Sequence, residues 1–515
     1  MADAQIRTQA SCDPWRMVLL LTTALTVARL MALFATPLDL YPDEAQYWLW
    51  SRTLDLGYFS KPPVIAWTIW ATTALGGDAE PWVRLASPLY HAGATLAVFG
   101  IGRRLYGETV GLAGAALYAL MPGVQLSATI MATDAPLLFF LSLTLLAYVE
   151  LQGAAGRRRL WLAAGFGAAL GLAFLSKYAA IYAVIGLVLH LAVSPAARAA
   201  WRGPTATAAA GALTVILAPN LAWNAAHHFV TFHHTADNAA WGGSQLFNTH
   251  ELGDFLISQF GVFGPIPFAV LLGGTAVLAA RRRLTGADVL LICFTLPPLL
   301  IVTIQSFISR ANANWSGAGY LPGAVLVAAW LVRWRAKRWL AGAIALQAAL
   351  AALFLVWIIV PATADAMGAA NSFKRAKGWS QITRMVLDRA EREPGLTAIA
   401  VNNRFLYNAI AYYGRDALTD PATPPLTVWL LAAEPKNQAE TTAPLTPARG
   451  ARVLGVVLED SYRDLMMADF AAVTGQELIR VRLDRKRQRR AELFVGERFA
   501  PRPRTGPVSG PPTPP

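Results

Sequence analysis

Long apolar stretches restrict what this chain of 515 residues can fold into. An α-helix rises about 1.5 Å per residue, so a helix of about 20 apolar residues crosses the hydrocarbon core of a membrane. Eleven stretches suit such helices: roughly residues 15–36, 83–102, 108–126, 134–152, 160–176, 178–194, 205–222, 261–280, 287–305, 316–332 and 339–361. Only 15% of the residues are charged, against about 25% in a typical soluble protein. The sequence therefore predicts a mainly α-helical, polytopic membrane protein.

The basic residues between these stretches predict its orientation. If the N-terminus is cytoplasmic, the short inner loops carry most of the Lys and Arg: Arg103, Arg104, residues 157–159, Arg198, Arg202, residues 281–283, Arg333, Arg335, Lys337 and Arg338. The outer loops are longer and hold few basic residues, which is the positive-inside pattern. An odd number of spans then leaves everything after residue 361 outside. Topology thus explains much of the net charge of +13 better than nucleic-acid binding does.

The chain changes character after the last apolar stretch, and we expect three parts: a transmembrane domain over 1–361, an extracytoplasmic α/β domain over 362–500 and a disordered Pro-rich tail over 501–515. The α/β domain is predicted from an amphipathic helix, a second helix, three short apolar strands and a hairpin that flanks the basic run RKRQRR. The two helices are expected over residues 373–393 and 460–470, and the three strands over 396–401, 426–431 and 453–458. The hairpin pairs residues 478–483 with 491–495.

A loop rich in acids and aromatic residues follows the first apolar stretch, at residues 41–67: YPDEAQYWLWSRTLDLGYFSKPPVIAW. Asp43 and Glu44 precede a helix-like segment, where acidic side chains can cap free backbone N–H groups. Two adjacent acids beside a membrane are costly for structure alone, so a general base is the second interpretation.

Lys61 in the same loop stands before Pro62 and Pro63. A following proline keeps Lys61 out of a helix, so its ammonium lies on a rigid turn. It either reaches along the membrane interface or holds a phosphate. The apolar run 64–75 is too short to cross the membrane and predicts an interfacial helix.

Three other predicted outer segments carry polar side chains. Asp134 in MATDAP either caps a helix or supplies a second active-site carboxylate. Four histidines, His227, His228, His233 and His234, invite a zinc interpretation, but no HExxH or Cys partner supports it and recognition of a sugar or phosphate is the alternative. The segment SRANANW offers Arg310 for phosphate or carboxylate and Asn314 and Trp315 for a sugar.

Several blocks of the sequence resemble, in the same order, the bacterial glycosyltransferase family 39/83 group, which is related to protein O-mannosyltransferases and to the aminoarabinose transferase that modifies lipid A. The blocks are YPDEAQYW, GYFSKPPVIAW, MATDAPLLFF, WNAAHHFVTFHH, SQFGVFGPIPF and NANWSGAGYLPG. The similarity covers roughly residues 15–430. It implies the GT-C fold, with about 11 transmembrane helices, outer juxtamembrane helices and often an outer soluble domain.

The resemblance also implies a reaction, in which a sugar moves from a polyprenyl phosphate to an acceptor outside the cytoplasm. Asp43 matches the position of the catalytic acid, Glu44 its neighbour and Asp134 the second acidic position. Lys61 matches the lysine that holds the lipid phosphate, and Arg310 and the histidine segment match regions near the donor cavity. Direct displacement, with inversion at the anomeric carbon, is expected.

Together these observations predict an enzyme, a multi-pass glycosyltransferase of a bacterial inner membrane with its active site in the periplasm. The predicted partners are a polyprenyl-phosphate-linked sugar, an acceptor glycolipid of the lipopolysaccharide or lipid A type or a protein hydroxyl, and membrane lipids, but no nucleic acid. The sequence identifies no cofactor, and a divalent metal is possible. A transporter or flippase of a lipid-linked sugar is the alternative, but it needs charged residues at mid-span, whereas the polar groups here lie at one predicted face.

Overall fold

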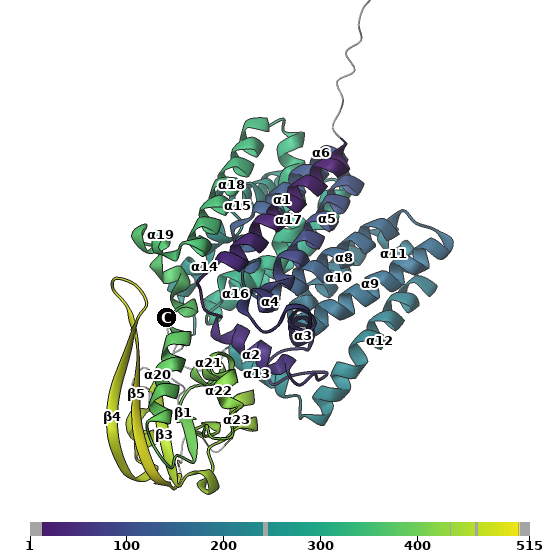
Figure 1. The fold of residues 1–515 in the computed structure, drawn as a ribbon. Coiled ribbons are helices and arrows are strands. Elements are labelled where there is room, and N and C mark those ends of the chain that lie inside the picture. The colour runs from purple at the N-terminus through teal and green to yellow at the C-terminus, as the bar shows by residue number, and fades with distance from the viewer. Residues whose placement is uncertain (1–12, 240–245, 433, 459–461, 503, 505–515) are drawn as a thin grey trace, which may run out of the picture.

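Helices make up most of the protein in the computed structural model, which describes residues 13–239, 246–432, 434–458, 462–502 and 504 (Figure 1). Seven of the described helices are long and apolar enough to cross a membrane. They are α1 (Pro14–Ala35), α8 (Asp134–Gln152), α9 (Gly156–Ser176), α12 (Pro204–Ala226), α16 (Gly286–Ile308), α17 (Gly317–Arg333, taken with the turn η2, Ala313–Ser316) and α18 (Lys337–Ile359). The predicted fold class, a mainly helical multi-pass membrane protein, is confirmed.

Further apolar helices complete the bundle: α3 (Val64–Gly76), α5 (Ala86–Tyr106), α6 (Glu108–Leu120), α10 (Ile181–Val193), α14 (Thr249–Val262) and α15 (Pro265–Ala280). The last two bend by 113° against one another. Gly264 between them has a φ of 100°, which only glycine adopts readily, and Pro265 then starts the next helix without a backbone N–H. Each of the eleven predicted stretches overlaps a helix, and the number of membrane crossings stays a prediction.

Short helices and turns join these elements at their ends: α2 (Pro42–Ser51), α4 (Glu80–Arg84), α7 (Pro122–Ser127), η1 (Tyr178–Ala180), α11 (Pro195–Ala200), α13 (Val230–Ala239) and α19 (Pro361–Ala366). Small residues let the long helices approach one another closely. At Gly167 in α9, for example, an added Cβ would lie 2.0 Å from the carbonyl oxygen of Ala209 in α12. The helix predicted over 64–75 is present as α3.

The C-terminal region folds around a five-stranded sheet of order β2-β1-β3-β5-β4. Its strands are β1 (Ala398–Val401), β2 (Leu426–Val428), β3 (Arg452–Leu458), β4 (Phe470–Arg482) and β5 (Gln488–Phe499). β1 pairs in parallel with β2 and β3, whereas β5 pairs antiparallel with β3 and β4. The surrounding helices and turns are η3 (Ala370–Ala376), α20 (Trp379–Glu391), α21 (Arg404–Tyr413), α22 (Arg415–Leu418), α23 (Gln438–Thr442), η4 (Pro447–Arg449) and α24 (Arg463–Met467).

The structure corrects some expected element bounds in this region. The helix expected over 373–393 is interrupted, because Lys377 is extended and Gly378 is left-handed with a φ of 84°. Of the helix expected over 460–470 only α24 is present, since Phe470 already pairs with Phe499 as β4 begins; residues 459–461 lie outside the described part. The predicted hairpin is confirmed, with longer strands. The helix α21 was not predicted.

The C-terminal tail lies mostly outside the described residues, so its expected disorder is untested. Two described residues of the tail do make contacts. Arg502 N donates to Asp469 Oδ1 at 3.0 Å, and Arg504 Nη2 donates to Asp469 Oδ2 at 2.5 Å.

Aromatic and carboxylate contacts fasten the C-terminal region to α2 and its flanks. Tyr412 of α21 donates to the carbonyl oxygen of Asp78 at 2.6 Å, and its ring meets Trp48 edge-on at 5.0 Å. Asp39, which precedes α2, accepts hydrogen bonds from the backbone N–H groups of Trp379 and Ser380 at the start of α20. The helix α2 and its flanking residues are therefore packed against residues that lie more than 300 positions away in the sequence.

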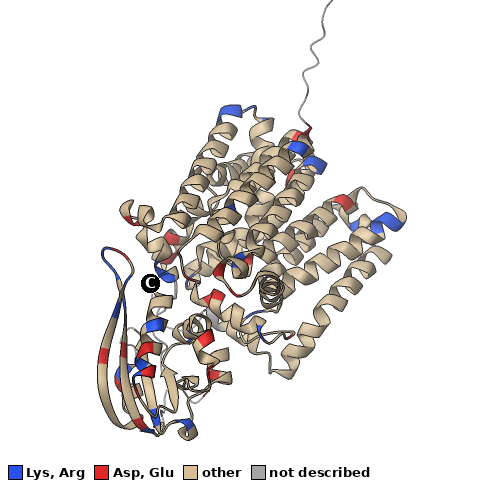
Figure 2. Cartoon of the chain, viewed as in Figure 1, with Lys and Arg blue, Asp and Glu red and all other residues tan. Residues whose placement is uncertain are grey.

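Charged residues divide the molecule into two ends. Figure 2 shows Lys and Arg at the ends of long helices on the side away from the sheet, and mixed charges on the sheet and its helices. The middle of the helical bundle shows few charges. This distribution matches the loop charges from which the orientation was predicted.

Candidate active site

A cavity of about 450 Å³ lies where α2 meets the ends of several long helices; we call it the central cavity. Its lining comes from eight separate parts of the chain: Asp43, Gln46, Tyr47, Ser60, Lys61, Lys177, His234, Glu251, Arg310, Ala311, Asn312, Trp315, Arg375 and Arg404. Three of the predicted outer segments, namely residues 41–67, the histidine segment and SRANANW, thus meet at one place. The C-terminal region adds Arg375 and Arg404.

Positive charge exceeds negative charge in this lining. Five cationic side chains, Lys61, Lys177, Arg310, Arg375 and Arg404, face two carboxylates, Asp43 and Glu251. An excess of cations in a confined space suits an anionic ligand, and Arg side chains in particular bind phosphate and carboxylate with paired hydrogen bonds.

Asp43 lies in the first turn of α2, after Pro42 at the first helical position. The side chain is half-buried and lines the central cavity. Free N–H groups at a helix start favour a negative charge there, so the location suits a carboxylate. Neighbouring residues on a helix point about 100° apart, so Asp43 and Glu44 face different surroundings.

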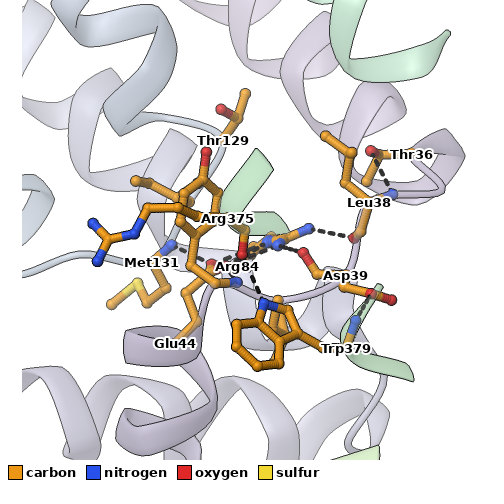
Figure 3. A network of polar contacts seen from close by, with 12 residues as sticks. Thr36, Leu38, Asp39, Glu44, Arg84, Thr129, Met131, Arg375 and Trp379 are labelled. Carbon is orange, nitrogen blue, oxygen red and sulfur yellow. Dashed lines mark hydrogen bonds and ion pairs between the residues drawn. The ribbon is translucent and has the colours of Figure 1, made fainter. Parts of the chain in front are cut away.

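Glu44 lies in a buried ion pair with Arg84, and neither side chain is more than 3% exposed. Arg84 donates from Nη2 and Nε to the two carboxylate oxygens at 2.8 and 2.9 Å. The same guanidinium donates to the carbonyl oxygens of Leu38 and Asp39 at 3.2 and 2.8 Å (Figure 3). Arg84, the last residue of α4, therefore joins that helix to the segment that leads into α2.

Backbone N–H groups use the remaining hydrogen-bond acceptor capacity of the Glu44 carboxylate. It accepts hydrogen bonds from Tyr41 N at 2.8 Å, as the acid of a capping box, and from Met131 N at 2.7 Å. With Arg84 included, both oxygens of Glu44 are engaged, which suits a structural role. This arrangement sets the rotation of α2 and with it the direction of Asp43.

Lys61 lies on a turn that several backbone contacts hold. Its carbonyl oxygen accepts from Tyr58 N at 3.1 Å, and the Tyr58 carbonyl oxygen accepts from Thr231 Oγ1 at 2.7 Å. Burial and the nearby Lys177 lower the pKa of Lys61 to about 8, although Asp43 and Asp134 favour its charged form. Lys61 is thus a cation at neutral pH that releases its proton more readily than an ordinary lysine.

Asp134, at the start of α8, does not line the central cavity, but it forms an ion pair with Lys177, which does. Its Oδ1 accepts from Lys177 Nζ at 2.9 Å and its Oδ2 accepts from Asn314 Nδ2 at 3.2 Å. Sequence reasoning missed Lys177 as a site residue. The available signal was that this single lysine separates two long apolar stretches, 160–176 and 178–194.

The predicted histidines divide between two cavities. His234 lines the central cavity, whereas His227, His228 and His233 line a neighbouring cavity of about 820 Å³. This second space, which we call the aromatic cavity, includes Trp50, Tyr58, Phe59 and Trp223 in its wall and shares Gln46 and Arg404 with the central cavity. His227 stacks on Trp223 with ring centroids 4.0 Å apart.

The positions of the His, Cys, Asp and Glu side chains bear on the zinc interpretation. Among the described residues, no three His, Cys, Asp or Glu side chains lie close enough together to hold one ion. Of the segment SRANANW, Arg310 and Trp315 line the central cavity, while Asn314 contacts Asp134. Arg375 and Arg404 were also missed, because their region lies far away in the sequence.

Known proteins resemble this chain over most of its length. A family model described as dolichyl-phosphate-mannose-protein mannosyltransferase matches residues 60–223. The lipid A galacturonosyltransferase RgtD of Rhizobium johnstonii is 37% identical over 407 residues, which are 78% of this chain and 83% of the relative. The crystal structure of ArnT from Cupriavidus metallidurans bound to undecaprenyl phosphate has 17% identity and a TM-score of 0.65, over 92% of this chain and 97% of ArnT. Its apo form has a TM-score of 0.63. The ArnT structures share the fold.

The buried pair gives a stability prediction. Arg84→Met leaves the Glu44 carboxylate buried without its cation, so we expect a loss of about 3–5 kcal/mol in the free energy of unfolding and a clearly lower melting temperature in detergent. Glu44→Gln/Arg84→Met removes both charges and should recover part of that loss. Arg158→Met, which breaks an ion pair on an Arg side chain that is 70% exposed, should change stability by about 1 kcal/mol or less. Equal melting temperatures for Arg84→Met and Arg158→Met would contradict the structural role.

Proposed function

This chain belongs to the GT-C family of membrane glycosyltransferases, and on that premise we propose that it transfers an acidic sugar from a polyprenyl phosphate to an envelope glycolipid of the lipid A type. The relative RgtD, a lipid A galacturonosyltransferase, supports both the acidic sugar and the acceptor. The fold shared with ArnT bound to undecaprenyl phosphate supports the lipid-linked donor.

One observation carries the proposal: a carboxylate at a helix start, Asp43, shares a confined cavity with Lys61, Lys177 and three arginines. Transfer of a sugar from a lipid phosphate to a hydroxyl needs a base for the acceptor proton and cations for the departing phosphate. The central cavity contains both. A transporter has no need for this combination.

In the proposed reaction Asp43 accepts the proton of an acceptor hydroxyl. The hydroxyl oxygen forms a bond to the anomeric carbon from the side opposite the phosphate. The bond between that carbon and the phosphate oxygen breaks, and its electron pair stays on the polyprenyl phosphate. Lys61 and Lys177 stabilise the charge that develops there, with Asp134 and Asn314 positioning Lys177. Attack from the opposite side inverts the anomeric centre.

The surplus of arginines supports an acidic sugar. Two lysines suffice to accompany one phosphate, and Arg310, Arg375 and Arg404 remain in the same lining. A guanidinium matches the two oxygens of a uronic-acid carboxylate. A neutral hexose would offer no carboxylate to these guanidinium groups. Trp315 offers a ring face to the sugar.

We place the enzyme in a bacterial inner membrane, with the N-terminus in the cytoplasm and the central cavity on the periplasmic side. The basic loops at the helix ends away from the sheet support this orientation. Reporter proteins fused after Arg104 and Arg283 should therefore read as cytoplasmic, and a fusion after Ala370 as external. A cytoplasmic signal at Ala370 would reverse the proposed orientation.

Asp43 is the proposed general base, so Asp43→Asn should lower the turnover rate by about 10²–10⁴-fold. Asparagine keeps the size and an oxygen that can accept hydrogen bonds from the helix start, so the melting temperature should stay near that of the wild type. Transfer rate and polyprenyl-phosphate binding, measured side by side, separate chemistry from binding. Asp416→Asn, at a 96% exposed side chain on α22, serves as the control. A normal turnover rate for Asp43→Asn would contradict the proposed role of Asp43 as general base.

Lys61 predicts a pH dependence for donor binding. Its charged form is the one that attracts phosphate, and that form is lost as pH rises through the pKa of about 8. The affinity for polyprenyl phosphate should therefore fall between about pH 7 and 9, a range in which the phosphate itself is already ionised. Lys61→Arg should bind with an affinity that stays constant over this range. A wild-type affinity that is flat from pH 7 to 9 would argue against phosphate binding by Lys61.

The substrates are tested by mass spectrometry of envelope lipids from cells with and without the gene. We expect the deletion strain to lack one hexuronic acid on its lipid A. Reintroducing the wild-type gene should restore this sugar, whereas reintroducing the gene for the Asp43→Asn variant should not. Loss of a neutral sugar instead would contradict the assignment of the arginines, and unchanged lipids would contradict the acceptor.

A further inference from the structure

A third cavity, of about 620 Å³, is lined by one side of the β4–β5 hairpin and by η3; we call it the basic cavity. Eight Lys and Arg line it, two from η3 and six from the hairpin between Arg482 and Arg490, against one acid, Asp484. The run RKRQRR, which the reaction proposed above leaves unused, supplies five of the eight. Like charges so close together repel one another, so the arrangement favours a ligand that carries negative charge.

Defined contacts hold the walls of the basic cavity. Asp484 accepts from the backbone N–H groups of Lys486 and Arg487 at 2.7 and 2.9 Å, so the acid is used to form the turn. Arg489 is buried, lies over the Trp379 ring at 3.6 Å and donates to the Lys374 carbonyl oxygen at 3.0 Å. The hairpin is thereby fixed to η3 and α20.

The basic cavity adjoins the active site. Pro42 lies in its wall, and the next residue, Asp43, lines the central cavity. Arg375 lines both cavities. The two cavities therefore adjoin at Arg375 and at the Pro42–Asp43 peptide.

The hairpin also lies near the point where the chain leaves the bundle. Arg487 donates to Asn371 Oδ1 at 2.6 Å, shortly after α19, and Figure 1 shows the hairpin turn beside α19. The basic cavity thus lies close to the end of α18, the last long apolar helix, and blue residues at the hairpin turn are visible in Figure 2.

We propose that the basic cavity binds an oxyanion group, phosphate or carboxylate, on the headgroup of the acceptor glycolipid and so presents an acceptor hydroxyl to Asp43. This inference rests on the proposed function. The donor phosphate already has Lys61 and Lys177 in the central cavity, so a second anionic site next to the base fits the acceptor. Exposed Arg and Lys side chains bind either oxyanion.

The test removes two exposed charges from the hairpin turn with Arg485→Gln/Lys486→Gln. The control, Arg480→Gln/Arg498→Gln, removes two exposed charges from β4 and β5 outside the basic cavity. Three acceptors are compared: a bisphosphorylated glucosamine-disaccharide lipid, the same lipid without phosphates but with an acidic sugar, and the neutral lipid. We expect the turn variant to raise KM for the anionic acceptors about tenfold, with kcat and KM for the neutral lipid unchanged. The control should match the wild type.

Binding of the three lipids to the protein in nanodiscs, without donor, separates this inference from the proposed function. Equal binding of anionic and neutral acceptors by the wild type, or equal losses for the turn variant with all three, overturns the inference even where transfer is intact. Phosphatidylglycerol vesicles that compete as well as the acceptor would show a general contact with membrane headgroups and also overturn it. Charge-dependent binding without any transfer would support anion binding by the basic cavity and would refute the proposed transfer reaction.

Discussion

The buried ion pair between Glu44 and Arg84 is the contact on which the candidate site depends. A charge removed from water is costly unless a partner and hydrogen bonds compensate for it, so these two side chains and the backbone groups that they contact have to come together. They join the segment before α2, the start of α2, the end of α4 and the loop before α8. Once these parts are fixed, the position of Asp43 at the rim of the central cavity follows from the geometry of a helix.

The positive charge around Asp43 comes from parts of the chain that share only their position at one end of the bundle. Lys61 precedes α3, Lys177 ends α9 and Arg310 follows α16, while Arg375 and Arg404 belong to the C-terminal region. Because the long helices run across the membrane, loops far apart in the sequence meet at its surface. The C-terminal region contributes directly to the site through α21, whose Tyr412 packs on α2.

The two charged cavities divide the recognition of anions between them. The central cavity combines cations with a carboxylate that can accept a proton, which is what group transfer requires. The basic cavity lacks a free base, since Asp484 is bound by the turn, and its many arginines suit binding alone. Arg375 lies between them and couples the two spaces.

Sequence patterns by themselves were sufficient for the helical membrane class, the helix after Pro63 and the hairpin around RKRQRR, because local periodicity and turn chemistry specify such elements. They also drew attention to Asp43 and Lys61 through their unusual setting. Only the tertiary structure paired Glu44 with Arg84, placed Lys177 beside Asp134, brought Arg404 to the cavity and bent the chain by 113° near Gly264. The physical reason is that a buried charge is compensated by whichever partner lies near it in space. The separation of two residues along the chain does not indicate which residue that partner is.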